Sequence, residues 1–371
     1  MCPSRPSEVK MNEKLLRAAQ QGDAETVTNI LDSSVSVKEC LTSFHKKSGD
    51  TAAHLAARHG HVSILTVLNS FGASFEMENL DGKRALHEAA ISGQDDCVKY
   101  LLSVKANVDP LKRADWTPLM LACTKSNLRV IQELVNHGAD LRLRNKDGWN
   151  CFHIAAREGH TDILKYILDC NNDIWDTVSK NGRTPLHTAA LHGNLEAVKL
   201  FLQQCTYKVD SVDSCGTTPL MDAIRTGFID TADALIDIHK ADHMKSDTLG
   251  RQALHLAAQA GCEVSIHFLI EKCGAPVNSV TAIGGLSPLH LAAKEGQCGA
   301  IQCLLGLSAD INITDFKGRT ALHMAVGGHH LECVRCLLAN GAIDFEDKSG
   351  TKASQLTEKQ DIRRLFEEMA Q

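Results

Sequence analysis

A motif with a period of about 33 residues recurs along this chain, and its regular spacing constrains the fold more strongly than any other feature. Residues 182–190 (GRTPLHTAA) and residues 318–325 (GRTALHMA) are its clearest copies. Its threonine position recurs every 33 to 35 residues, at Thr51, Arg84, Thr117, Asn150, Thr184, Thr218, Gln252, Ser287 and Thr320. A period this constant predicts a solenoid, in which each repeat buries its apolar face on the next.

Each copy carries the signals of two short helices. In the fourth copy, Asp147 and Gly148 favour a tight turn, and Asn150 follows as a cap for the first helix. Gly159 is placed to end that helix in the left-handed conformation. The apolar spacing of residues 163–168 then predicts a second, amphipathic helix.

The Thr-Pro-Leu-His motif and its period together resemble the ankyrin repeat family. This resemblance implies an all-α ankyrin-repeat solenoid of about nine full repeats, with degenerate N- and C-terminal caps. We expect a disordered N-terminal tail over residues 1–11 and a single continuous array over residues 12–371. Within the array, we expect the N-terminal cap near residues 12–45 and the C-terminal cap near residues 346–371.

Charge and hydropathy narrow the partner class and the location. The 371 residues carry a formal net charge of −6, which gives no overall attraction to nucleic acid or to anionic membrane. No apolar run approaches the roughly 20 residues that cross a bilayer, and no apolar signal segment follows the N-terminus. We therefore expect a monomer of the cytoplasm and nucleus that binds neither membrane nor, directly, nucleic acid.

The 14 cysteines suggest a disulfide or metal framework until the repeats are aligned. Cys97 and Cys333 then share one position of the second helix, and Cys303 and Cys336 share another three residues later. Both positions belong to the apolar stripe, so these thiols act as small hydrophobic side chains. Cys333 and Cys336 also form a C-x-x-C motif, but no second ligand pair follows at zinc-finger spacing. We expect reduced thiols, no metal site and no cofactor.

Seven histidines occupy one position, the last residue of the Thr-Pro-Leu-His motif: His54, His87, His153, His187, His255, His290 and His323. An imidazole there can bond backbone groups of the adjoining turn, so we expect this set to link repeats. The chain has no glycine-rich phosphate loop, no H-E-x-x-H motif and no G-x-S-x-G motif. We predict a non-enzymatic protein with no catalytic residues.

Ankyrin arrays bind partners along the concave face, through the turn fingers and the exposed side of the first helices. Basic and aromatic residues gather at these positions in the third to fifth repeats. The predicted partner-binding residues are Lys112, Arg113, Trp116, Lys125, Arg144, Lys146, Trp149, Arg157, Lys180 and Arg183. Trp and Arg most often carry interface energy, so we predict that Trp116 and Trp149 expose their rings and anchor a protein partner. The alternative is that the two rings fill the joints between fingers.

The same region departs from the repeat pattern. Asp115 replaces the turn glycine, and Ser126 replaces the glycine that ends the first helix. We expect a positive φ at both positions, with strain of about 1 kcal/mol. Strain of this kind is tolerated more often where function gains from it, which supports the predicted surface.

Local sequence in this region resembles one vertebrate member of the family, in residues 112–120 (KRADWTPLM), 130–135 (VIQELV) and 146–154 (KDGWNCFHI). The resemblance implies binding to the catalytic domain of alanyl-tRNA synthetase. It also implies that lysine side chains accept misactivated serine and so help to prevent serine mischarging. Lys146 matches one acceptor and Lys112 is a second candidate, whereas Arg113 and Asp176 stand where further lysines are expected.

Two other partner classes stay open. A generic ankyrin adaptor would bind a peptide of another protein, with no preference for a synthetase. A nucleic-acid binder would use the basic surface on tRNA, although the net charge of −6 disfavours this class. Binding that weakens steeply with added salt would identify it.

Overall fold

The computed structural model describes residues 6–369, and the regular secondary structure there is helical. Three isolated β-bridges occur, but no β-strand forms within this range. The chain divides into two compact units, the first ending at Lys180 and the second beginning at Asn181. No helix in the described part of the chain is long and apolar enough to cross a bilayer.

The first unit holds an N-terminal group of three helices and four further helix pairs. Its elements are α1 (Pro6–Gln21), α2 (Ala24–Asp32), α3 (Val37–Leu41), α4 (Ala52–His59), α5 (Val62–Ser70), α6 (Ala85–Ile91), α7 (Asp95–Ser103), the 3₁₀ turn η1 (Arg113–Asp115), α8 (Pro118–Ala122), α9 (Leu128–Asn136), α10 (Cys151–Glu158) and α11 (Thr161–Cys170).

The second unit holds five helix pairs and a C-terminal helix. Its elements are α12 (Pro185–Leu191), α13 (Leu195–Gln204), α14 (Pro219–Thr226), α15 (Ile229–Asp237), α16 (Ala253–Ala260), α17 (Glu263–His267), the π-helical turn η2 (Phe268–Lys272), α18 (Pro288–Lys294), α19 (Cys298–Gly306), α20 (Ala321–Gly327), α21 (Leu331–Ala339), the 3₁₀ turn η3 (Ala353–Leu356) and α22 (Gln360–Met369).

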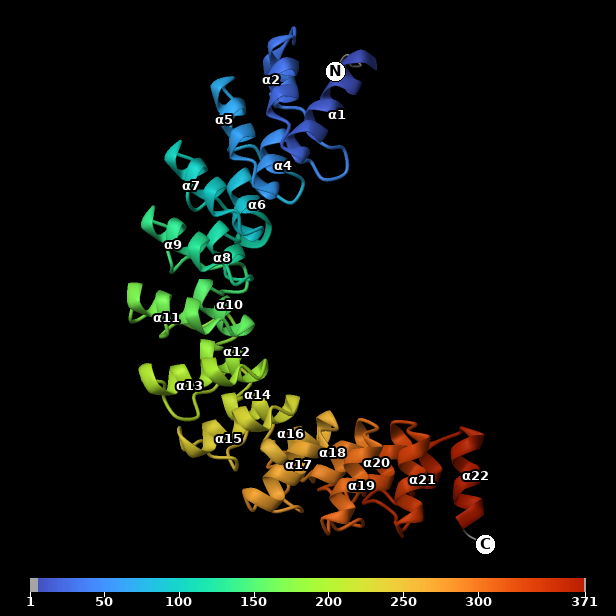
Figure 1. Cartoon of the computed structure of the whole chain (residues 1–371). Coiled ribbons are helices and arrows are strands. Elements are labelled where there is room, and N and C mark those ends of the chain that lie inside the picture. Colours follow the sequence, from blue (N-terminus) through green and yellow to red (C-terminus); the bar gives the residue numbers. More distant parts are fainter. Residues whose placement is uncertain (1–5, 370–371) are drawn as a thin grey trace. The chain divides into compact units, whose positions relative to one another are not determined.

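The described helices include nine pairs, α4–α5 to α20–α21, which coincide with the nine predicted repeats. In the first unit, the first helices of the pairs (α4, α6, α8 and α10) follow one another, and the second helices (α5, α7, α9 and α11) form a parallel row (Figure 1). The second unit continues this pairing from α12–α13 to α20–α21, with η2 extending the second helix α17. The predicted all-α ankyrin-repeat solenoid is therefore confirmed.

Pairs of alanines allow successive first helices to pack closely. Ala56 and Ala57 of α4, like Ala89 and Ala90 of α6, are 0 % exposed, and the two helices pack on each other. A larger side chain at any of these positions would push the neighbouring helix away. The predicted steric role of the alanine pairs is confirmed.

The ends of the chain differ in part from the expectation. Of the tail predicted to be disordered, residues 1–5 lie outside the described residues, but residues 6–11 are helical because α1 begins at Pro6. Proline suits the first position of a helix, since the N–H that it lacks has no helical partner there. At the other end, α22 lies in the predicted C-terminal cap and packs on α21. Residues 370–371 of that cap lie outside the described range.

Six buried histidines each join their own repeat to the next one. In α12, Nδ1 of His187 accepts the backbone N–H of Thr184 at 3.2 Å, so Nε2 carries the proton and donates to the carbonyl of Thr217 at 3.0 Å. Burial lowers the pKa of His187 to about 4, which keeps the ring neutral. The same two bonds are made by His54, His87, His255, His290 and His323. The predicted linking role is confirmed for these six histidines.

The loop that precedes each first helix forms a finger that hydrogen-bonds to the finger before it. A backbone N–H at a fixed position of the repeat donates to a carbonyl of the preceding finger. In the first unit these bonds join Leu80 to Ser48, Arg113 to Asp81, Lys146 to Ala114 and Lys180 to Asp147. Equivalent positions of successive fingers are therefore neighbours.

Two carboxylates are buried at the same position of different repeats, directly after the motif's fourth residue. Glu88 is paired with Arg58 of the preceding repeat, with Nε 3.0 Å from Oε2, and Asp222 is paired with Arg183 of its own preceding repeat. Burial alone would raise the pKa of Glu88, but the hydrogen bond from Arg58 and the charges of Arg58 and Lys83 together outweigh it, so the pKa is lowered. Burial raises the pKa of Asp222 to about 6 despite the two arginines beside it, Arg183 and Arg225.

Replacing one linking histidine should make folding less sensitive to acid. Because the pKa of His187 falls from 6.5 to about 4 on folding, the unfolded chain binds more protons between these values. The free energy of unfolding is therefore unaffected by the protonation of His187 above about pH 6.5, and it decreases as the pH falls toward 4. His187→Met copies Met221, which occupies the same position two helices later.

The variant should lose about 1 kcal/mol at pH 7 with the bond to Thr217. When the pH is lowered from 6 to 5, however, the free energy of unfolding should decrease less in the variant than in the wild type. The difference should be up to about 1.4 kcal/mol per pH unit. Urea unfolding followed by circular dichroism at pH 7, 6 and 5 measures both effects. Identical pH slopes for the two proteins would contradict the prediction.

Candidate partner-binding surface

Three successive fingers of the first unit carry a basic residue at one position. Arg113, Lys146 and Lys180 have exposed side chains, and their backbone N–H groups bond the preceding finger at 3.2, 3.0 and 3.0 Å. The bonds place these three residues on neighbouring fingers, so their cationic groups follow one another along one edge. We call Arg113, Lys146 and Lys180 the basic edge.

Trp116 is the last residue of the finger that carries Arg113, directly before Thr117, the cap of α8. Its carbonyl accepts the backbone N–H of Lys112 at 3.0 Å and the Nε2–H of His87 at 3.2 Å, so its backbone belongs to the joint between repeats. The indole ring is half-buried, and Nζ of Lys112 lies 5.5 Å from the ring centroid. Burial, together with the nearby ammonium of Lys83, lowers the pKa of Lys112.

Trp149 occupies the equivalent position of the next finger. Its ring is half-buried and lies against His153, with the ring centroids 6.2 Å apart and the planes 25° from parallel. Cζ of Arg157 lies 5.7 Å from the ring centroid, and the same guanidinium pairs with Glu158. Both tryptophans are half-buried, so their burial agrees with neither prediction in full, and their role in anchoring a partner stays a prediction.

Lys125 and Arg144 are exposed, as expected of partner-binding residues. Lys125 lies in the turn after α8 rather than on a finger. Arg144 reaches the next finger, where its Nη1 donates to the carbonyl of Val178 at 3.0 Å. The first unit thus contains nine of the ten predicted residues, on the fingers, at their bases or on the adjoining first helices and turns.

Arg183 is the exception, because it belongs to the second unit and is held by two acidic side chains. Its Nη1 lies 3.0 Å from Oδ2 of Asp213, and its Nη2 pairs with the buried Asp222. The arginine side chain is only 17 % exposed. Its guanidinium compensates a buried carboxylate, and its place in the partner-binding surface stays a prediction.

One of the two predicted departures from repeat geometry is present. Asp115 has φ 61°, and its neighbour Ala114 also has a positive φ of 63°. Ser126 is not among the described residues with positive φ, contrary to expectation. Helix α8 ends at Ala122, four residues earlier, and the turn that follows removes the need for a left-handed residue at position 126.

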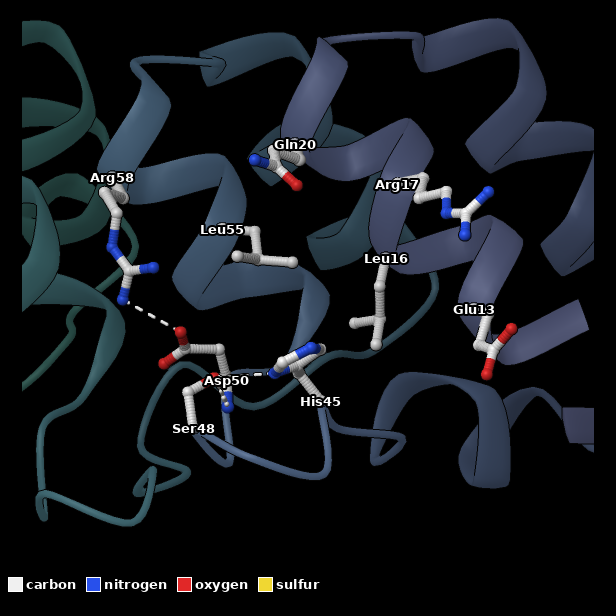
Figure 2. Close-up of a pocket in the computed structure, with 9 residues that line it drawn as sticks. All are labelled: Glu13, Leu16, Arg17, Gln20, His45, Ser48, Asp50, Leu55 and Arg58. Carbon is white, nitrogen blue, oxygen red and sulfur yellow. Dashed lines mark hydrogen bonds and ion pairs between the residues drawn. The ribbon is translucent and has the colours of Figure 1, made fainter. Parts of the chain in front are cut away.

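A hollow that the sequence did not predict lies near the N-terminal end of the first unit. It has a volume of about 450 Å³ and is bounded by α1, α4 and the loop between α3 and α4. Figure 2 shows Glu13, Leu16 and Arg17 on one side and Arg58 reaching Asp50 on the other. The sequence did not reveal this hollow because the segment of α1 and α2 lacks the Thr-Pro-Leu-His motif, from which finger positions are assigned.

The chemistry available at these surfaces is limited to charge, aromatic rings and lysine amines. No group of three or more His, Cys, Asp or Glu side chains within residues 6–369 could hold a metal ion. The surface that combines the basic edge with Lys112, Trp116 and Trp149 is suited to bind a protein by aromatic contact and charge.

Exchanging residues at two equivalent finger positions tests the strain at Asp115. Asp115→Gly should raise the free energy of unfolding by about 0.5–1 kcal/mol, because glycine adopts positive φ without a Cβ clash. Gly148→Asp is the matched reverse change at φ 80°. It should lower stability by more, since a Cβ there would lie 2.7 Å from the backbone nitrogen of Lys180. Urea unfolding measures both changes, and equal stability of all three proteins would show that the finger is unstrained.

Comparison with known proteins places this geometry in a family. A family model described as ankyrin repeats (3 copies) matches residues 15–114, 104–178, 172–247, 207–281, 238–315 and 289–357. The ankyrin repeat and KH domain-containing protein mask-1 of Caenorhabditis elegans is 31% identical over 42% of this chain and 6% of its own length. The E3 ubiquitin-protein ligase KEG of Arabidopsis thaliana is 27% identical over 91% of this chain and 22% of its own length.

The putative palmitoyltransferase ZDHHC13 of Danio rerio is 31% identical over 74% of this chain and 32% of its own length. This chain thus spans less than a third of the length of each of these relatives. The match of the ankyrin family model agrees with the nine helix pairs described above. Because the family model accounts for residues 15–357, this chain belongs to the ankyrin repeat family, whose fold binds other proteins.

Proposed function

We propose that this chain is a non-enzymatic scaffold that binds the catalytic domain of alanyl-tRNA synthetase and limits serine mischarging. The proposed contact surface is the basic edge together with Lys112, Trp116 and Trp149. Trp and Arg side chains commonly dominate interface energy, and the cations beside each ring add charge to an aromatic contact. A monomer in the cytoplasm and nucleus, where the synthetase would be met, is part of the proposal.

One observation supports this partner over others. The segments 112–120, 130–135 and 146–154 resemble vertebrate ankyrin repeat domain-containing protein 16. In the fold, these segments form the fingers of the two tryptophans, the starts of α8 and α10, and much of α9. The resemblance is therefore concentrated in two adjacent repeats and includes the residues that the surface exposes.

The proposed capture of serine is a simple acyl transfer. Misactivated serine is seryl adenylate, a mixed anhydride with an electrophilic carbonyl carbon. A neutral lysine amine attacks this carbon, an amide bond forms, the anhydride C–O bond breaks and AMP leaves, while the amine proton passes to water. A guanidinium stays protonated in proteins, so Arg113 can bind but cannot accept serine.

Two lysines suit this chemistry in different ways. Lys146 is exposed at the tip of its finger, where a bound partner can reach it. Lys112 is half-buried beside Trp116, and the lowered pKa of its amine increases the neutral fraction that can attack. We assign serine capture to Lys146 with Lys112 as the second acceptor, and regard both as secondary to binding.

The alternative is a generic ankyrin adaptor with another protein partner. The relatives support only this coarser function, since their names mention no synthetase. Direct tRNA binding by the basic edge is a third class. It predicts an affinity that falls steeply with salt, whereas an aromatic protein contact weakens less.

Removing either tryptophan ring should weaken the complex without unfolding the chain. We expect Trp116→Ala and Trp149→Ala each to reduce the binding free energy by roughly 1 to 4 kcal/mol. Trp175→Ala is the matched control, because this half-buried tryptophan lies after α11 and not on a finger. Titration calorimetry with the synthetase catalytic domain measures affinity, and circular dichroism measures helicity. A loss of helicity that accounts for the whole loss of binding would show that the rings only fill joints.

Serine capture should be concentrated on the two lysines. The full chain is incubated with alanyl-tRNA synthetase, serine and ATP, and seryl adducts are mapped by peptide mass spectrometry. Lys146→Arg should keep the affinity and remove most of the adduct at the finger tips, while Lys112→Arg should reduce the remainder. Lys348→Arg is the matched control, since Lys348 has the same finger position in the second unit.

The outcomes separate the two parts of the proposal. Adducts spread over all exposed lysines, Lys348 included, would contradict selective capture. A stable complex with no adduct would leave a binding protein that does not accept serine. Absence of a complex would contradict alanyl-tRNA synthetase as the partner.

A further inference from the structure

Three thiols of the second unit form a cluster. Cys298 is the first residue of α19, whereas Cys333 and Cys336 lie three residues apart on α21, which packs beside α19. The side chain of Cys298 lies close enough to Cys333 and Cys336 to raise the pKa of both thiols, in addition to the effect of burial. Sγ of Cys298 also lies 3.8 Å from the carbonyl oxygen of Glu332, which precedes Cys333.

The three thiols differ in their access to solvent. Cys298 is half-buried, Cys336 is 8 % exposed and Cys333 is 1 % exposed. Burial raises the pKa of Cys333 to about 12 and that of Cys336 to about 11, so neither reacts readily on its own. Cys298 is therefore the thiol that a small oxidant in solution meets first.

The three thiols are not simply neighbours on the apolar stripe of one helix, because they come from two repeats. Alignment of the repeats assigns Cys333 and Cys336 to the apolar stripe, and their burial agrees with that assignment. Cys298, however, comes from the neighbouring repeat and lies 38 residues before Cys336. Its contact with both thiols brings together a pair that could be joined across two repeats, and the described residues contain no site that could hold a metal ion here.

We propose that Cys298 and Cys336 form a peroxide-sensitive pair that closes to a disulfide between α19 and α21. The Cys298 thiol first releases its proton to the solvent, and the thiolate attacks hydrogen peroxide. The O–O bond breaks, a sulfenic acid and a hydroxide form, and the hydroxide takes up a proton from the solvent to become one water. The sulfur of Cys336 then attacks the sulfenic sulfur, the S–O bond breaks, and its thiol proton leaves with the hydroxyl group as a second water. Two thiols are oxidised and one peroxide is reduced.

Cys336 is the partner because it is nearer to solvent than Cys333 and can rearrange with less disturbance of the core. Nδ2 of Asn340 lies 3.8 Å from its sulfur, at the end of α21. The disulfide would close a loop of about one repeat and hold the last full repeat against the one before it. Cross-linking of this kind restricts the unfolded chain, so the oxidised protein should unfold at a higher temperature.

The test uses the reduced full chain and one to five equivalents of hydrogen peroxide. Remaining thiols are alkylated, and peptides are mapped without reduction. We expect a cross-linked peptide pair containing Cys298 and Cys336, the loss of two thiols from this region, a raised melting temperature, and reversal by dithiothreitol. Cys336→Ser should abolish the cross-link, whereas Cys333→Ser, on the same helix and in contact with the same thiol, should keep it.

Cys215 serves as an internal control, because it is more exposed than Cys298. Oxidation that follows exposure, with Cys215 reacting first and Cys298 ending as sulfinic acid without a cross-link, would overturn the proposal. A cross-link that survives Cys336→Ser but is lost with Cys333→Ser would overturn the assigned pairing. Circular dichroism of each serine variant confirms that the comparison is made between folded proteins.

Discussion

One buried hydrogen bond, from an imidazole of the first helix to the loop of the next repeat, recurs at six histidines and holds those successive repeats together. Nε2 of His54 donates to the carbonyl of Lys83, and Nε2 of His290 donates to that of Arg319, each at 2.8 Å. The accepting residue lies directly before the next helix cap, so the bond fixes where the finger ends and the helix begins. In a solenoid each repeat contacts mainly its neighbours. A bond between neighbours therefore helps to fix how the repeats stack within each compact unit.

The candidate binding surface follows from the same bond. His87 donates to the carbonyl of Trp116, so the backbone of this tryptophan is fixed while its ring stays partly open. The finger-to-finger bonds then set the basic edge at regular intervals beside the rings. A partner would meet cations and indoles already held in position, which lowers the entropy lost on binding.

Much of this could be predicted from the sequence because its signals are local or periodic. The repeat period predicted the helix pairs, and the position of His187 in the motif predicted its linking role. Contacts between neighbouring repeats were less accessible, since they depend on the direction of long side chains. The sequence alone suggests that Arg183 is free to bind a partner protein, because the carboxylate with which it pairs, Asp222, lies 39 residues away. The positive φ predicted for Ser126 was wrong because α8 ends four residues earlier. The proximity of Cys298 and Cys336 was not predicted because they occupy different positions of the repeat.

The two buried carboxylates limit how this protein can change during evolution. Glu88 and Asp222 each depend on an arginine supplied by the repeat before them, Arg58 and Arg183. A repeat carrying such an acid, if duplicated or moved behind a neighbour without the arginine, would leave the buried carboxylate with only the cation of its own repeat, Lys83 or Arg225, and should be less stable. These repeats are therefore not interchangeable modules. Their order is specified by matched charges as well as by shape, and recombination should be tolerated only where both partners travel together.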